Sequence, residues 1–561
     1  MANALNAGFH GVSSGRRQPD ISHYKDIATA PPSVPIFNEA NVTAALDELN
    51  TSSPGPDGIS ARVLKSARHE LASIIAHLFN VFILIGFSPE QWRDAYLTPI
   101  AKVDHPLLWS DYRPISLTSN LCKTFERVLV KHILQLTQGM WAHNKQHGFL
   151  PGHSTADAVV QVLFDIGRAV DQGHPVLAIF FDFAKAFDLV PHDKLLIKLQ
   201  KHLPMWLVKW IAAYLSNRRQ RVQVGQTTTE WMQVEAGVIQ GSVLGPVLFL
   251  LYIHDINSYL PQSPSSNTEK YADDIISYII GKDVRSRLPQ DTVDAVQRWC
   301  DDNMMKLNAR KCEMMYFPPN KRDNFQPVVS LGATTLKVVD SYKYLGFLFN
   351  TKLDSNMQWD RVLGNVSSVP HLLRQLKRVG LSTEILVNVV KSLVLSHFRY
   401  SGILLDSCSE RVKDEMQHFQ NKLLRIIGVK RDEARAKYGI EDIRVFIERT
   451  GLEQTLRVLN SSTHSLPTSL LSSRKSHSSF PFTIPRARTT KFNESMVLKA
   501  LRHLRENVHG SGRKVTRLQA SPRSQAIISG TKARKTVKCP HCNIEFKRIS
   551  MHKCKAKRST E

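Results

Sequence analysis

The chain has few cysteines for its length and no long uninterrupted apolar run. Seven cysteines in 561 residues exclude a disulfide framework and indicate a reducing compartment. No stretch approaches the roughly 18 uncharged apolar residues that a membrane helix needs, so we expect no membrane span and no membrane partner. The first residues also lack the apolar segment of a secretory signal.

Acidic residues are scarce relative to basic ones. The chain has 74 Lys and Arg against 49 Asp and Glu, a formal net charge of +25. An excess of this size favours an anionic partner, nucleic acid above all, although general surface solubility is the simpler alternative. A hydrophobic content of 42% and a charged content of 22% indicate a globular protein with several subdomains.

Two adjacent carboxylates stand out in residues 270–280, KYADDIISYII. Asp273 and Asp274 lie between Tyr271 and a run of branched apolar residues. These flanks favour strands and put the polar pair at the bend of a tight hairpin. Neighbouring carboxylates repel each other, so a cation between them would stabilise the arrangement. An ordinary polar turn is the alternative.

A third carboxylate follows the apolar run Val176–Phe181, which predicts a strand buried on both faces. Asp182 ends this run, and the next residues, AKAFD, predict the beginning of a helix. Three carboxylates from two strands would form an oxygen site suited to Mg²⁺. Two such ions roughly 3.5–4 Å apart are the clamp used in phosphoryl transfer. Helix capping is the alternative role for Asp182.

Other segments carry residue types that suit a nucleotide site. Lys102 and Arg113 lie on neighbouring predicted strands, where they would bracket a triphosphate or simply be solvated. In GVIQGSVLGP, Gln240 offers an amide that can make two hydrogen bonds, and Gly241 allows close backbone approach.

The order of these segments resembles the reverse transcriptase of non-LTR (LINE-type, jockey-like) retrotransposons. The similar pieces are SSPGPDGIS, YRPISLTSNLCKTFE, QHGFLPGHST, FFDFAKAFDLVPHDKLL, GVIQGSVLGPVLFLLYIHDI, YADD, LNARKCEMMYF and YKYLGFLF. The resemblance implies an α+β right-hand polymerase with fingers, an antiparallel palm sheet and a helical thumb. It also implies an RNA-directed DNA polymerase, a nucleotidyltransferase that extends a primer on an RNA template by two-metal catalysis.

The resemblance assigns roles to single residues. Asp182, Asp273 and Asp274 match the metal-binding triad for two Mg²⁺ ions, with Mn²⁺ as a substitute. Lys311 matches a general acid toward pyrophosphate, and Phe187 matches the gate that excludes a ribose 2′-hydroxyl. The residues that match contacts to triphosphate, base and template are Lys102, Arg113, Gln240 and Gly241. The implied partners are an RNA template, a DNA primer or target, and dNTPs, in the nucleus after a cytoplasmic ribonucleoprotein stage.

Composition and resemblance together predict the domain organisation. We expect a disordered segment over residues 1–36, fingers and palm over 37–350, a helical thumb over 351–460, and a Ser/Pro-rich linker over 461–500. Residues 501–561 form a basic tail. The tail contains a candidate zinc knuckle for RNA or DNA at residues 539–554, with Cys539, Cys542, His552 and Cys554 as ligands. Incidental cysteines in a disordered tail are the alternative.

Two other functions stay open from the sequence. No apurinic-type endonuclease domain is expected before Phe37, so another protein would supply the nick in the target DNA. Ile239 stands where the family usually has proline, which leaves a catalytically inactive or domesticated remnant that binds nucleic acid as the main alternative. An RNA-templated RNA polymerase or intron maturase is the third hypothesis. Phe187 and the wording SVLGP argue against it.

Overall fold

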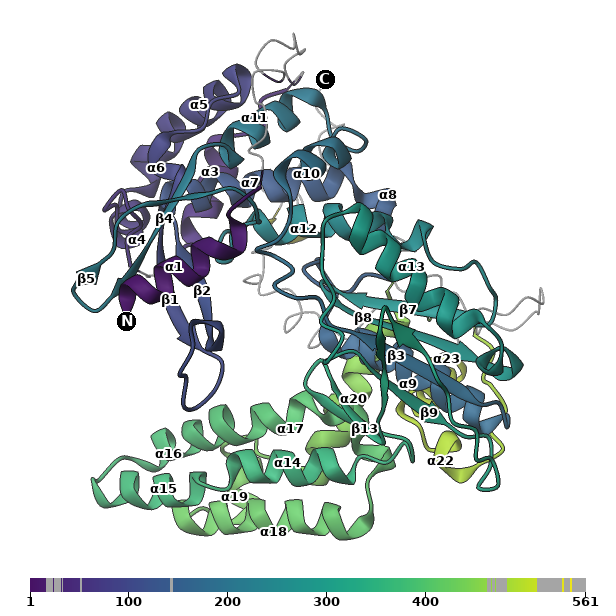
Figure 1. Ribbon diagram of the computed structural model, residues 1–561. Helices are drawn as coiled ribbons and strands as arrows, with labels where there is room; N and C mark the ends of the chain where they lie inside the picture. Colours follow the sequence, from purple (N-terminus) through teal and green to yellow (C-terminus); the bar gives the residue numbers. More distant parts are fainter. Residues whose placement is uncertain are drawn as a thin grey trace, which may run out of the picture. The chain divides into compact units, whose positions relative to one another are not determined.

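The structure is a computed structural model that describes residues 1–16, 24, 32, 34–50, 53–141, 145–461, 466, 470, 482–511, 537–538 and 545–546 (Figure 1). The chain forms two compact units, one of residues 1–471 and 482–503 and one of residues 472–481 and 504–561. In the second unit, the described residues are the end of helix α23 (Met496–Ser511) and the paired strands β15 (Val537–Lys538) and β16 (Glu545–Phe546).

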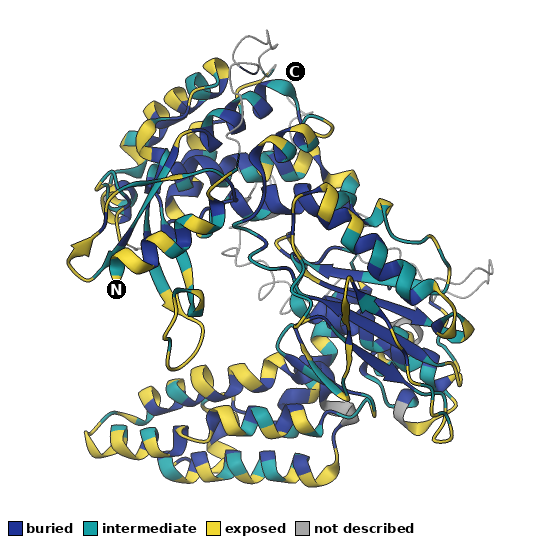
Figure 2. Cartoon of the chain, in the orientation of Figure 1, coloured by how far each residue is buried: buried dark blue, intermediate teal, exposed yellow. Residues whose placement is uncertain are grey.

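The candidate site is built on a five-stranded sheet in the order β12-β9-β3-β8-β7. Its strands are β3 (Val176–Phe181), β7 (Ser266–Tyr271), β8 (Asp274–Ile280), β9 (Glu313–Phe317) and β12 (Lys337–Val338). Strand β3 is central, pairs antiparallel with β8 and β9, and is buried over its whole length (Figure 2). The predicted antiparallel pairing therefore holds for β9, β3, β8 and β7, with the fully buried strand at the centre, while β12 pairs parallel with β9 at one edge.

Successive side chains of β3 point to opposite faces of the sheet, and all of them are apolar. Both faces are therefore apolar, and helices cover each of them. Leu177, Ile179 and Phe181 share a core with Val293 and Trp299 of α13 (Leu288–Asp302). On strand β8, Tyr278 donates its hydroxyl to Asp165 of α9 (Thr155–Asp171) at 2.6 Å. A strand buried on both faces reads as a continuous apolar run, which explains the sequence of β3.

A second sheet has the order β2-β1-β4-β5, with β6 also paired to β4. Its strands are β1 (Asp94–Ala101), β2 (Tyr112–Leu117), β4 (Arg218–Val224), β5 (Thr227–Thr228) and β6 (Met232–Val234). The helices of this region are α3 (Glu39–Asp47), α4 (Ala61–Ser66), α5 (Arg68–Ile85), α6 (Glu90–Arg93), α7 (Asn120–Leu136), α8 (Gln138–Trp141), α10 (His192–Leu199), α11 (Met205–Leu215) and α12 (Gly245–Ile253). Aromatic contacts join them: the rings of Phe125 and Trp210 stack at 4.5 Å.

The N-terminal segment contains a helix, α1 (Ala2–Ser13), where the sequence analysis expects disorder over residues 1–36. Leu5 and Phe9 are buried against Leu97 and Val222 of the second sheet. The prediction is therefore wrong for α1. The sequence pattern that could have predicted α1 is the spacing of Leu5 and Phe9, which are one helical turn apart. An apolar face of two residues is too short to be distinguished within a polar segment.

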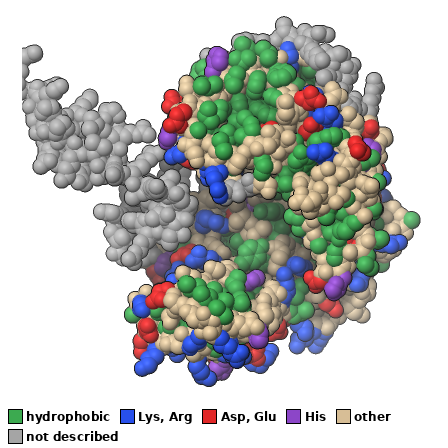
Figure 3. Space-filling view, turned by 90° about the vertical axis from the view of Figure 1, so that its left-hand side faces the viewer, with side chains coloured by type: hydrophobic (Ala, Val, Ile, Leu, Met, Phe, Trp, Pro, Cys, Tyr) green, Lys and Arg blue, Asp and Glu red, His purple; other side chains and the backbone are tan. Residues whose placement is uncertain are grey.

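Residues 356–459 form a helical bundle with its own core, in agreement with the predicted helical region. Its helices are α14 (Asn356–Val366), α15 (Val369–Arg378), α16 (Thr383–Val390), α17 (Ser396–Tyr400), α18 (Glu410–Ile427), α19 (Arg431–Ala436) and α20 (Ile443–Leu459). Many exposed side chains of this bundle are basic, and Lys and Arg gather on the lower part of the face in Figure 3. The exposed basic residues of the bundle include Arg374, Lys377, Arg378, Lys422, Arg425, Lys430, Arg431, Arg435 and Lys437.

Part of the predicted linker over residues 461–500 is instead packed against α9. The Asp171 carboxylate accepts the Thr489 N–H at 2.7 Å and the Arg488 N–H at 2.8 Å. Helices α22 (Thr490–Asn493) and α23 (Met496–Ser511) follow, with Phe492 near Phe164 at 5.9 Å. The linker prediction is therefore wrong for residues 482–500, because local Ser/Pro richness does not reveal a distant partner.

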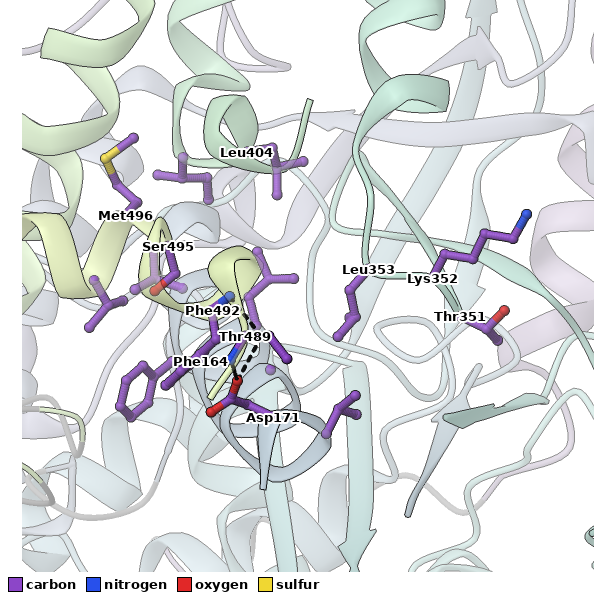
Figure 4. Close-up of a pocket in the computed structure, with 16 residues that line it drawn as sticks. Phe164, Asp171, Thr351, Lys352, Leu353, Leu404, Thr489, Phe492, Ser495 and Met496 are labelled. Carbon is purple, nitrogen blue, oxygen red and sulfur yellow. Dashed lines mark hydrogen bonds between the residues drawn. The ribbon is translucent and has the colours of Figure 1, made fainter. Parts of the chain in front are cut away.

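A cavity of about 240 Å³ remains between this segment and α9 (Figure 4). Its lining is mostly apolar, with Phe164, Leu353 and Met496 among the contributors. The lining residues of α9 lie toward the end that leads into the start of β3.

Within the described part of the chain, α5 is long and apolar enough to cross a membrane by length and composition alone. Its exposed face is also apolar and includes Ile74, Leu78 and Ile85. The opposite face packs Ala72, Ile75, Ala76, Phe79 and Ile83 into the core. Burial of one face is typical of a core helix, and the expectation of no membrane span stays a prediction.

Candidate active site

The hairpin of β7 and β8 places the two adjacent aspartates as the sequence predicts. Tyr271 pairs with Asp274, so Ala272 and Asp273 form the bend. Ala272 has φ of 57°, a left-handed conformation that costs an L residue about 1–2 kcal/mol. The bend is therefore strained at the residue directly before Asp273.

Asp182 lies at the same edge of the sheet, directly after β3. The pairing of Phe181 with Ile275 places it next to Asp274 in the ladder. Its N–H donates to the Cys312 sulfur at 3.4 Å, and its carbonyl oxygen accepts the Asn308 N–H at 2.8 Å. These bonds fix its backbone at the strand end.

The helix predicted at AKAFD is absent. Residues 184–189 form turns, and the next helix, α10, begins at His192. Lys185 has φ of 49°, which no helix interior tolerates. The helix-capping alternative for Asp182 is therefore wrong, because no helix begins beside it.

Asp182 and Asp273 are half-buried and Asp274 is exposed, but the surrounding protein displaces enough water to raise the pKa of all three carboxyl groups at this edge. The pKa of Asp274 rises to about 6 because of burial and the charges of Asp273 and Asp182. The pKa of Asp273 is raised by burial and by Asp182, and Arg113 opposes this shift. For Asp182, Lys311 and a hydrogen bond from Asn308 oppose the effect of burial on its pKa. The three groups are close enough to feel one another's charge.

The described residues contain no group of three or more His, Cys, Asp or Glu side chains arranged to hold a metal ion. The donor set nevertheless fits Mg²⁺, a hard cation that prefers carboxylate oxygens. Three carboxylates with raised pKa values at one edge of a sheet provide such oxygens, and a cation there would relieve their mutual repulsion.

Three predicted cations lie around these carboxylates. Burial, together with the charges of Arg113 and Lys311, lowers the pKa of Lys102, which shows that the three basic groups are neighbours. Lys102 also donates its ammonium group to the Ser110 carbonyl oxygen at 2.8 Å. Arg113 faces Ile100 across the antiparallel pair of β1 and β2. The structure thus brings Lys102, Arg113 and Lys311 together beside the aspartates.

Phe187 lies in a group of aromatic rings. Its ring stacks on Phe249 at 4.6 Å and meets the edge of Phe149 at 6.1 Å. These contacts fix the orientation of a half-buried side chain on the turn after β3. The Phe187 ring is therefore held by packing against two other aromatic rings.

Gln240 and Gly241 contact protein groups that the sequence did not indicate. The Gln240 amide donates to Asp188 at 2.8 Å. A Cβ on Gly241, which has φ of 108°, would lie 2.6 Å from the Ser116 carbonyl oxygen of β2. The absence of a side chain at Gly241 is therefore required for packing on β2.

Asp188 is a site residue that the sequence analysis missed. Burial raises its pKa to about 6, opposed by the Gln240 hydrogen bond and by Lys185 and Lys102. The available signal was a second aspartate in FDFAKAFD, six residues after Asp182. The zinc-knuckle ligands Cys539, Cys542, His552 and Cys554 lie outside the described residues.

We expect Asp274→Asn to stabilise the metal-free protein at pH 8. The folded-state pKa of about 6 exceeds the ordinary aspartate value of about 3.9, so the native state holds a proton that the unfolded chain releases between these values. Stability due to Asp274 is therefore present below about pH 4, falls as pH rises to about 6, and stays low above it.

Thermal unfolding with EDTA provides the measurement. The Tm of Asp274→Asn should exceed that of the unsubstituted protein at pH 8, and the difference should vanish below pH 4. Asp291→Asn, on the exposed surface of α13, is the control. Equal Tm values for Asp274→Asn and the unsubstituted protein at pH 8 would contradict the raised pKa.

Comparison with known proteins gives a family for this region. Residues 100–349 match the family "Reverse transcriptase (RNA-dependent DNA polymerase)". The chain is 29% identical over 404 residues to the probable RNA-directed DNA polymerase from transposon X-element of Drosophila melanogaster. That alignment covers 68% of this chain and 42% of the relative.

Two further relatives come from the same organism. The RNA-directed DNA polymerase from mobile element jockey is 27% identical, with 67% of this chain and 42% of the relative covered. The probable RNA-directed DNA polymerase from transposon BS is 30% identical, with 57% of this chain and 36% of the relative covered. The chain thus spans about two fifths of the length of these curated relatives.

Among solved structures, apo telomerase from Candida tropicalis aligns with a TM-score of 0.37 and 11% identity, covering 67% of this chain and 66% of that chain. The assignment rests on the sequence relatives and on the matched segment, which contains β3, the β7–β8 hairpin and all three aspartates. Residues 100–349 therefore match the reverse transcriptase family, and the chain is similar to the RNA-directed DNA polymerases of non-LTR retrotransposons such as jockey.

Proposed function

We propose that this chain extends a DNA primer on an RNA template by using dNTPs. The observation that carries the proposal is the meeting of Asp182, Asp273 and Asp274 at one edge of the central sheet, within the reverse transcriptase domain. The main alternative, an inactive remnant that binds nucleic acid, has no comparable observation in its favour.

Asp182, Asp273 and Asp274 would hold Mg²⁺, and the metal would supply activation of the primer hydroxyl and stabilisation of charge on the phosphates. Each aspartate must be ionised to act, and the raised pKa of Asp274, about 6, puts this requirement near neutrality. The backbone bonds of Asp182 to Asn308 and Cys312 hold its carboxylate at the strand end. The chain itself thus contributes positioning and a fixed electrostatic environment.

The basic residues would bind and neutralise the triphosphate. Lys102 directly follows β1 and Arg113 lies on the paired strand β2, while the charge of Lys311 acts on both Lys102 and Asp182. A guanidinium can hold two phosphate oxygens at once, while an ammonium acts as a point charge. Lys311 would also donate a proton to departing pyrophosphate.

Phe187 would select deoxynucleotides. Its stacking on Phe249 prevents the ring from moving aside, so a 2′-hydroxyl would collide with it. Gln240 would reach the incoming base only if its bond to Asp188 opened, or would act by holding that loop in place. Gly241, packed on Ser116, would shape the same loop.

The proposed partners beyond the dNTPs are polyanions. The basic surface of the helical bundle suits the backbone of a template–primer duplex. A zinc knuckle at Cys539, Cys542, His552 and Cys554 would add a contact to RNA or DNA. We further propose nuclear action on a DNA target.

Primer extension on poly(rA)·oligo(dT) with Mg²⁺ tests the proposal. We expect extension with dTTP and none with UTP, because Phe187 excludes the 2′-hydroxyl. Extension with both nucleotides would refute the role of Phe187. Binding of the template–primer without any extension would favour the inactive remnant.

A further inference from the structure

A short segment before α9 is fixed beside the β7–β8 bend. The Lys270 N–H donates to the Lys145 carbonyl oxygen at 2.9 Å, and the His147 N–H donates to the Lys270 carbonyl oxygen at 2.8 Å. The buried His147 ring also hydrogen-bonds the buried Glu269 carboxylate at 2.9 Å. Residues 145–148 are therefore held along the edge of β7 up to the bend.

Within this segment, the Gln146 side chain contacts the bend directly. Gln146 is 2% exposed, and its Oε1 accepts the Ala272 N–H at 2.9 Å and the Gly148 N–H at 2.8 Å. The pairing of Tyr271 with Asp274 leaves Ala272 in the bend, outside the paired residues of β7 and β8. Gln146 thus provides a hydrogen-bond acceptor for the buried Ala272 N–H, which lies outside the paired residues of the hairpin.

Gly148 shows how closely the two segments approach. A Cβ on Gly148 would lie 2.5 Å from the Ala272 nitrogen and 3.2 Å from Gln146 Oε1. No side chain fits between these atoms. The contact therefore depends on both the acceptor at Gln146 and the bare backbone at Gly148.

We propose that Gln146 is a positioning residue that fixes the direction of Asp273 by holding the Ala272 amide. The inference rests on the polymerase function proposed above. Ala272 keeps a left-handed φ of 57°, which is unfavourable for an L residue, and the buried hydrogen bond to Gln146 offsets that cost. Without the acceptor, Ala272 relaxes and Asp273 moves with it.

The expected loss of rate can be estimated from how strongly a reaction rate depends on the position of the reacting groups. A displacement of about 1 Å at a reacting group costs about 10²-fold in rate. Gln146→Met removes the acceptor while keeping side-chain length and burial. We expect it to extend primers about 10²-fold more slowly than the unsubstituted protein.

Hydrogen–deuterium exchange with EDTA supplies a readout that does not depend on activity. In Gln146→Met, the peptide over residues 270–276 should exchange faster. Gln146→Glu should keep the protection of this peptide, because a carboxylate oxygen accepts the same two hydrogens. Gly148→Ala leaves Gln146 unchanged but pushes the two segments apart. It should therefore increase hydrogen exchange of residues 270–276 and lower the primer-extension rate.

Gln420→Met in α18 is the matched control. Gln420 is 4% exposed, and its Oε1 likewise accepts a backbone N–H, that of Ile443 at 2.9 Å. This control should leave both the exchange of residues 270–276 and the extension rate unchanged.

Unchanged protection, or an unchanged extension rate, in Gln146→Met would overturn the positioning role. If the unsubstituted protein extends no primer, the polymerase function itself fails. In that case the exchange measurement still decides whether Gln146 holds the bend.

Discussion

The substitution Asp273→Asn should reduce the rate of primer extension by at least about 10³-fold. The substitution keeps size and shape but removes a charged oxygen ligand from the bend that faces Asp182 and Asp274. Loss of several kcal/mol of charge stabilisation in the transition state corresponds to this factor, since about 1.36 kcal/mol changes a rate tenfold. Single-turnover extension on an RNA template with saturating Mg²⁺ measures it.

A folded but inactive variant is the expected outcome. Asp273→Asn removes repulsion among neighbouring carboxylates, so its metal-free Tm at pH 8 should not fall. Asp291→Asn should extend primers normally. A rate above one tenth of the unsubstituted rate in Asp273→Asn would contradict the assignment of the three aspartates.

Replacing Glu126→Leu should destabilise the first unit by about 3–5 kcal/mol. Glu126 is completely buried and accepts the Tyr214 hydroxyl at 2.6 Å, the Val243 N–H at 2.6 Å and the Leu244 N–H at 3.2 Å. Each donor left unpaired in the core costs about 1–3 kcal/mol. The loss should be visible as a lower midpoint of urea unfolding.

Two further measurements separate the contributions of Glu126. Tyr214→Phe removes one donor and leaves the carboxylate paired, so it should cost only about 1 kcal/mol. Because Val243 and Leu244 follow Gln240 and Gly241, Glu126→Leu should also raise the KM for dNTP. If Glu126→Leu had the same free energy of unfolding as Tyr214→Phe, the role of Glu126 as a shared acceptor would be contradicted.

The central sheet and its carboxylates could be predicted because local sequence patterns specify them. The apolar run of β3 indicates a strand buried on both faces, and paired aspartates between β-favouring residues indicate a bend. Their convergence needed one more element, the resemblance of segment order to a known family. The antiparallel register of β3 and β8 then provides the physical reason.

The contacts that support the site could not be predicted, because they join residues far apart in the sequence. Gln146 meets Ala272, Gln240 meets Asp188, and Glu126 meets Val243. A polar residue in a loop looks the same whether it faces water or a buried amide. Nothing local distinguishes these three from solvated residues.

The packing of α1 and of residues 482–500 escaped prediction for a related reason. Both segments bury apolar side chains, such as Leu5 and Phe9 in α1 and Phe492 and Met496 in residues 482–500, against elements elsewhere in the chain. Composition reports whether a segment can form its own core, not whether it docks on an existing one.

The position of β3 in the sheet also affects how the protein emerges from the ribosome. Its two neighbours, β8 and β9, begin at Asp274 and Glu313, long after Phe181 has been synthesised. Closing such long loops is slow, and unpaired strand edges invite aggregation. We therefore expect β3 to remain unpaired, and covered by nascent helices or a chaperone, until translation has passed Phe317.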